Sequence, residues 1–120
     1  MKSILERIVA TPAGAYAVLS LAALLEVSGD ACFQSALYQA TGFQRLTWIA
    51  AGVFVLSSYG VFVNLPPWDF GKLLGVYVVL FFVIAQIVAK LRFHQSPTVP
   101  ILAGGALIVA GGLLITFWKA

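Results

Sequence analysis

The sequence predicts an all-α integral membrane protein, built as a bundle of four transmembrane helices. Two observations support this fold class. Of the 120 residues, 62% are hydrophobic and 9% are charged, whereas a soluble domain averages about 45–50% apolar and about 25% charged residues. Four long apolar stretches also alternate with short polar stretches, and each apolar stretch is long enough to cross a bilayer. We therefore expect one small membrane domain over residues 1–120.

The first spanning helix is expected over residues 12–38. Thr11 and Pro12 are typical of a helix N-cap followed by the first helical position. A helix of about 26 residues is about 39 Å long, which exceeds a hydrocarbon core of about 30 Å. The helix must therefore tilt or protrude, and Glu26 lies near the midplane in either case. Residues 1–10 mix charged and apolar side chains, so we expect them at the membrane interface.

The other three spanning helices are expected over residues 46–63, 71–90 and 99–118. Trp48 near the start of the first of these suits the aromatic belt at a membrane surface. The consecutive prolines Pro66 and Pro67 cannot continue a helix, so they mark a turn. A polar stretch over residues 90–98 separates the last two helices.

Two carboxylates, Glu26 and Asp30, interrupt the first apolar stretch. A carboxylate at the centre of a membrane helix costs roughly 2.5–3.5 kcal/mol, and such residues indicate a functional site. Their spacing of four places both on one helix face, and Gln34 extends this polar stripe. A low-dielectric site favours the neutral carboxyl group, and neighbouring carboxyls titrate together. The pair can thus hold protons and exchange them for a cation.

Two interpretations of Asp30 stay open at this point. It can belong to the proton and substrate site, or it can form a structural ion pair with Lys72 or Lys90 near a membrane surface. Three further side chains are candidates for hydrogen bonds or ring faces at the site, namely Ser58, Tyr59 and Tyr77. A tyrosine ring facing a cation contributes about 0.5–2 kcal/mol. The alternative for the tyrosines is a packing role.

Small residues concentrate in the last helix, where Gly104 and Gly105 form one pair and Gly111 and Gly112 form a second. Glycines seven apart return to one helix face and let two backbones approach closely. The stripe serves either packing inside one chain or a dimer. We favour a dimer interface, because four helices of this length hardly enclose a substrate cavity alone.

The positive charges are nearly balanced across the membrane. Four spans place both termini on one side, with Lys2, Arg7, Lys72 and Lys119, and leave three basic residues on the other side, Arg45, Lys90 and Arg92. Orientation follows Lys/Arg asymmetry, so the chain is weakly oriented. Two interpretations stay open: the chain inserts in both orientations, or so few charges do not indicate its orientation.

Composition also excludes several functions. The single Cys32 and single His94 leave no disulfide, cysteine cluster or ordinary metal site. No nucleophile–base pair or phosphate loop occurs, so we expect neither an enzyme nor a cofactor. Basic residues are scattered between apolar runs, which makes nucleic acid an unsuitable partner.

These features resemble the small multidrug resistance (SMR) family of the drug/metabolite transporter superfamily. Residues 22–29 (AALLEVSG) resemble the family's first-helix signature around its essential glutamate. Tyr16 falls where members often have an aromatic residue facing the site. Residues 104–112 (GGALIVAGG) are similar to the glycine-bearing fourth helix through which the family dimerises. The resemblance implies an antiparallel, dual-topology homodimer, or a pair of paralogues, in a bacterial inner membrane.

The same resemblance implies proton-coupled efflux of small or lipophilic cations at Glu26. Two departures bear on the substrate. Members that export drugs or guanidinium have a Trp in the third helix, where this chain has residues 73–76 (LLGV), and Asp30 is extra. Residues 75–78 (GVYV) look more like an uncharacterised branch of small membrane proteins related to SMR transporters.

Two other functions therefore remain as alternatives to cation efflux. One is transport of a lipid-linked or metabolite substrate by the same fold, and the other is a non-transporting membrane subunit or scaffold. Replacing Glu26 with Gln separates transport from scaffolding. The sequence leaves the substrate, the direction of transport and its stoichiometry open.

Overall fold

The computed structural model describes residues 4–118 as five helices: α1 (Ile4–Ala10), α2 (Pro12–Tyr38), α3 (Phe43–Val63), α4 (Phe70–Phe93) and α5 (Val99–Phe117). The four helices α2 to α5 are long and apolar enough to cross a membrane. This confirms the predicted fold class of an all-α integral membrane protein with four spanning helices. The first ten residues, expected at the membrane interface, include the short helix α1, which packs on α2.

Helix α2 begins with the expected cap. The Thr11 hydroxyl accepts a hydrogen bond from the Gly14 N–H at 3.1 Å, and Pro12 is the first helical residue. The cap satisfies one of the backbone donors that a helix N-terminus leaves free. Residues 64–69 form the loop between α3 and α4, where the two prolines predicted a turn.

Two helices are longer than the sequence predicts. Helix α3 begins at Phe43 rather than at residue 46, because Gly42 at its N-cap has φ 62° and turns the chain sharply into the helix. Helix α4 ends at Phe93 rather than at residue 90. His94, in the left-handed conformation, follows its last residue and donates its N–H to the carbonyls of the preceding turn. Helix α5 ends at Phe117, one residue before the expected end.

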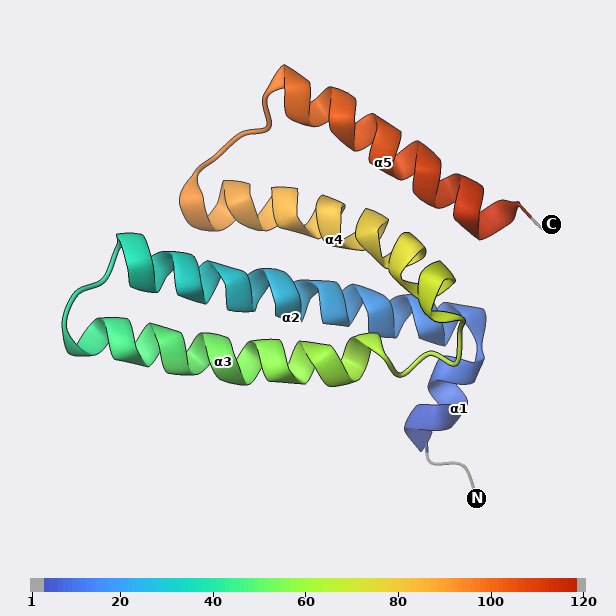
Figure 1. Ribbon diagram of the computed structural model, residues 1–120, viewed down its shortest axis with the longest axis horizontal. Coiled ribbons are helices and arrows are strands. Elements are labelled where there is room, and N and C mark those ends of the chain that lie inside the picture. The colour runs from blue at the N-terminus through green and yellow to red at the C-terminus, as the bar shows by residue number, and fades with distance from the viewer. Residues whose placement is uncertain (1–3, 119–120) are drawn as a thin grey trace.

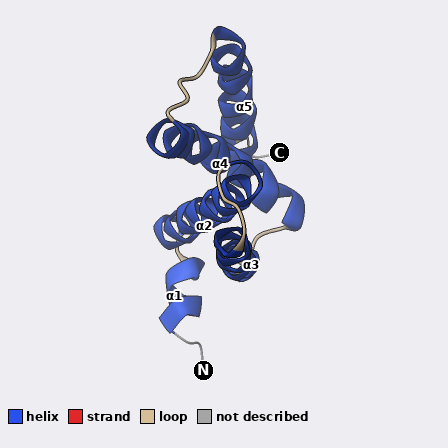
Figure 2. Ribbon diagram, turned by 90° about the vertical axis from the view of Figure 1, so that its left-hand side faces the viewer, coloured by secondary structure: helices blue, strands red, loops and turns tan. Residues whose placement is uncertain are grey.

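The spanning helices lie in a single row, in the order α3, α2, α4 and α5 (Figure 1). Helix α2 packs against both α3 and α4, whereas α5 packs against α4 alone among the described helices. The molecule measures 51 × 43 × 20 Å, and a helix with its side chains is about 10–12 Å across. The row is thus less than two helices thick, and the view along the helices shows how α5 stands apart from α2 and α3 (Figure 2).

Glycines permit the close packing of α2 on α3. A Cβ atom at Gly29 would lie 2.6 Å from the Leu56 side chain, and one at Gly52 would lie 2.7 Å from the Phe33 ring. Small residues let membrane helices approach closely where apolar burial provides no driving force between them. The buried core lies where α2, α3 and α4 meet, and consists of Leu19, Ala22, Ala23, Val63, Leu73, Val76 and Tyr77.

Two arginines, whose contacts the sequence did not predict, join the helices at the end of the row where α2 and α4 finish. Arg45 at the start of α3 donates from Nε to the Ala36 carbonyl of α2 at 2.9 Å. Arg92 near the end of α4 donates from Nη2 to the Ser35 hydroxyl of α2 at 2.8 Å, and its guanidinium lies 5.4 Å from the Trp48 ring centre. These contacts tie both neighbours of α2 to its last turn.

The glycine pairs of α5 divide between two environments. Gly105 and Gly112 are buried against α4, where a Cβ atom would meet Phe82 and Val79 respectively. Gly104 and Gly111 have nothing within 4 Å of a Cβ position. Half of the predicted stripe therefore packs inside the chain, and the other half is left open on α5.

This division predicts opposite effects of the same substitution at neighbouring positions. Gly112→Ala places a methyl group against Val79, so we expect a loss of about 1–3 kcal/mol in the free energy of unfolding from overpacking. Gly111→Ala is the matched control, and its better helix propensity raises stability by up to about 1 kcal/mol. Unfolding by sodium dodecyl sulfate in mixed micelles measures both, and equal effects would contradict the packing described here.

Candidate functional site

A hydrogen bond between α2 and α4 forms the centre of the candidate site. The Tyr77 hydroxyl donates to Glu26 Oε1 at 2.7 Å, a distance typical of strong O–H···O bonds. The Tyr77 side chain is buried, with 4% of its surface exposed, and Glu26 is half-buried. Glu26 lies one residue past the middle of α2, so the bond supplies a donor to a carboxyl group at the depth where water is scarce.

Two aromatic rings pack near the Tyr77 ring, whose hydroxyl reaches Glu26. The centre of the Tyr59 ring of α3 lies 5.9 Å from the centre of the Tyr77 ring, and the centre of the Phe81 ring lies 6.2 Å from it. Three helices thus bring together a carboxyl group and a set of ring faces, which we call the Glu26 site (Glu26, Tyr59, Tyr77 and Phe81). Ring faces attract cations through their quadrupole, so this combination suits a positively charged ligand.

Phe81 was not singled out from the sequence. It lies four residues after Tyr77 in α4, so both side chains occupy one helix face. That spacing is the signal that would have found it. However, eight of the ten residues from 76 to 85 are branched aliphatic or phenylalanine side chains, so no single apolar residue stands out in this stretch.

Asp30 lies one turn beyond Glu26 on α2, about 6 Å further along the helix axis. Its side chain is exposed. Within residues 4–118 it forms no ion pair with Lys72 or Lys90, so the structural pairing left open by the sequence does not occur in this chain. Gln34, a further turn along, is also exposed. A carboxyl group at this depth requires cover from water or from another protein surface.

Two other predicted site residues, Ser58 and Tyr16, make contacts with other partners. Ser58 lies in α3 next to Tyr59, but its hydroxyl donates to the Phe54 carbonyl of its own helix at 3.1 Å. Tyr16 lies ten residues before Glu26 on α2, which is about 15 Å along the axis. Its ring meets the Trp68 ring edge-on, with centres 5.5 Å apart. Tyr16 is therefore not part of the Glu26 site within one chain.

Fold and site together define an integral, multi-pass membrane protein with ionisable side chains within its first spanning helix. A UPF0060 membrane protein of the bacterium Herpetosiphon aurantiacus is 30% identical over 101 residues, which make up 82% of this chain and 88% of that relative. This chain belongs to the UPF0060 family of membrane proteins. No family model matches the chain, and no solved structure matches it. Kinship with the SMR family stays a prediction.

The contact between Tyr77 and Glu26 predicts a difference between two tyrosine hydroxyls. Tyr77→Phe removes the donor and leaves Glu26 without it, so we expect the free energy of unfolding to fall by about 1–2 kcal/mol. Tyr59→Phe is the control, because the Tyr59 hydroxyl has no hydrogen bond among the described residues, and we expect a change within about 0.5 kcal/mol. Unfolding in mixed micelles measures both. Equal losses would show that the hydrogen bond does not stabilise the chain.

Proposed function

We propose that this protein is an SMR-like, proton-coupled transporter that exports small or lipophilic cations. The observation that carries the proposal is the hydrogen bond from Tyr77 of α4 to Glu26, which lies within the spanning helix α2. The rings of Tyr59 and Phe81 lie near the Tyr77 ring. A carboxyl group that is half-buried at this depth binds either a proton or a cation, because either one neutralises its charge. The sequence resemblance to the SMR family supports the same assignment.

Exchange follows from the shared charge of Glu26. An arriving cation replaces the proton on the carboxyl group, and the proton leaves to the side of the membrane from which the cation came. The Tyr77 hydroxyl holds the carboxyl group in place during this exchange, while the rings of Tyr59 and Phe81 contact the cation. Proton return on the opposite side then releases the cation.

We further propose that two copies of this chain form the transporter, in antiparallel orientation. Asp30 is exposed within a spanning helix, and the row of helices leaves its faces open. A second row would cover Asp30 and contribute a second Glu26. The open glycines Gly104 and Gly111 offer α5 a surface for close contact with its copy. The balanced positive charges permit insertion in both orientations.

Transport in proteoliposomes tests the role of Glu26. With a proton gradient, vesicles containing the wild-type protein are expected to accumulate a cation such as tetraphenylphosphonium, and Glu26→Gln is expected to reduce uptake to the level of protein-free vesicles. Asp69→Asn is the matched control, because Asp69 is exposed in the loop before α4, and it retains uptake. A Glu26→Gln protein that transports like the wild type would refute the exchange mechanism and favour a scaffold.

The dimer is tested by a bulky side chain on the open face of α5. Gly111→Leu is expected to convert the dimer into a monomer, because the leucine prevents close helix contact. Gly71→Leu serves as control, since its Cβ position is equally open but lies on α4. Light scattering of the protein–detergent complex measures the molar mass. A Gly111→Leu protein that stays dimeric would move the interface to another helix.

A further inference from the structure

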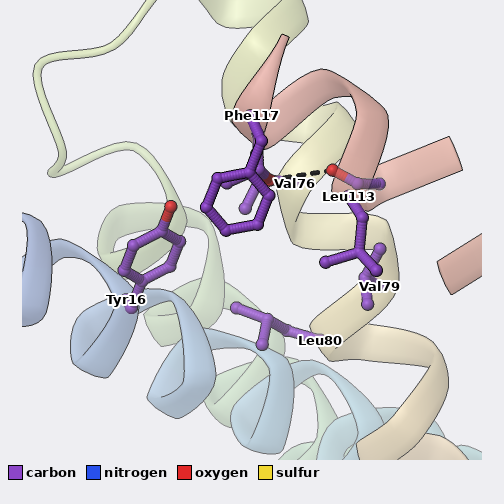
Figure 3. A pocket seen from close by; sticks show the side chains of 8 residues that line it. Tyr16, Val76, Val79, Leu80, Leu113 and Phe117 are labelled. Carbon is purple, nitrogen blue, oxygen red and sulfur yellow. Dashed lines mark hydrogen bonds between the residues drawn. The ribbon is translucent and has the colours of Figure 1, made fainter. Parts of the chain in front are cut away.

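A pocket of about 270 Å³ lies outside the Glu26 site, between α2, α4 and α5. Its walls are largely apolar side chains, with Val76, Val79 and Leu80 from α4 and Leu113 and Phe117 from α5. The Tyr16 ring of α2 lines it beside Phe117 and across from Leu113 and Val79 (Figure 3). The only other side-chain hydroxyl in the lining, that of Thr116, is bonded to the Gly112 carbonyl of its own helix. The pocket thus suits a hydrocarbon chain.

The pocket exists because α5 packs against α4 and against no other described helix. Val79 packs on Gly112, which brings the two helices together at that level. Towards the end of the row where α2 and α4 begin and α5 ends, α5 has no further neighbour among the described helices (Figure 1). The space left there is lined by apolar side chains of the spanning helices.

A positive charge lies above this pocket. Lys72 precedes Val76 by four residues in α4, so it occupies the same helix face one turn closer to the helix start. Its Nζ lies 5.3 Å from the Trp68 ring centre, and Trp68 packs on Tyr16 in the pocket wall. Lys72 is exposed and has no carboxylate within salt-bridge distance in the described part of the chain, although Asp69 lies three residues before it.

From this arrangement we infer a binding site for an anionic phospholipid. One acyl chain fills the pocket between α4 and α5, and the phosphate of the headgroup pairs with Lys72. Trp68 and Tyr16 lie between headgroup and chain, where amphipathic rings are favoured at a membrane surface. Lys72 disfavours a cationic occupant, so the lipophilic part of a transported cation does not use this pocket. The inference is independent of transport, because it involves none of the residues of the Glu26 site.

Fluorescence quenching of Trp68 tests the site directly. The protein for this experiment carries Trp48→Phe and Trp118→Phe, so that Trp68 is the remaining tryptophan. The probes are phosphatidylglycerol and phosphatidylcholine with brominated acyl chains, added to the detergent-solubilised protein without any transport substrate. We expect phosphatidylglycerol to quench at an about fivefold lower concentration, the ratio given by about 1 kcal/mol of attraction per basic residue.

Two pairs of variants separate the headgroup from the chain. Lys72→Gln is expected to abolish the preference for phosphatidylglycerol, whereas Lys90→Gln, an exposed lysine near the other end of α4, retains it. Thr116→Phe fills the pocket and is expected to reduce quenching by both lipids, whereas Leu114→Phe, on α5 but outside the pocket, leaves quenching unchanged.

Three results would overturn the inference. The first is equal quenching by the two lipids, and the second is a preference for phosphatidylglycerol that survives Lys72→Gln. The third is a Thr116→Phe protein that loses its dimer but keeps wild-type quenching. This third result would show that a second copy of the chain, and not a lipid, occupies the pocket. Because Lys72 is exposed, its substitution tests the headgroup contact even if the pocket-filling variant does not fold.

Discussion

A carboxyl group within a membrane helix must be neutralised or hydrogen-bonded, and this constraint explains why Tyr77 lies where it does. Glu26 lies one residue past the middle of α2, and the Tyr77 hydroxyl of α4 reaches it at 2.7 Å. The contact holds α4 against α2 at the level of the buried core, to which Tyr77 itself belongs. Packing and chemistry therefore depend on the same residue, because the side chain that completes the core also supplies the donor for the carboxyl group.

The arrangement of the helices explains why one chain is half of the proposed transporter. Helices α3, α2 and α4 bring the Glu26 site together, whereas α5 contacts α4 alone among the described helices. On α5, Gly105 and Gly112 pack on α4, and Gly104 and Gly111 face open space. The exposed Asp30 of α2 needs cover at hydrocarbon depth. The row thus exposes the Asp30 carboxyl group of α2, and its last helix, α5, presents a surface for close contact.

Local signals in the sequence predicted the local structure. The cap at Thr11, the turn at Pro66 and Pro67 and the four spans follow from composition and short motifs. Contacts between helices were harder to predict, because helices that are apolar all round carry little periodic polarity to mark the face that packs. Tyr16 therefore meets Trp68 rather than Glu26, and Phe81 joins the site unpredicted. Glu26 was predictable because a charge in an apolar stretch needs no knowledge of the neighbouring helix.

Proton release on cation binding tests the central claim most directly. Tetraphenylphosphonium is added to the detergent-solubilised, dimeric protein in weakly buffered solution, and a pH indicator reports the protons set free. Our account predicts that the wild-type protein releases protons as it binds the cation and that the Glu26→Gln protein releases none. Release that is unchanged in Glu26→Gln, or no release from folded wild-type protein with any cation of a panel, would contradict exchange at Glu26.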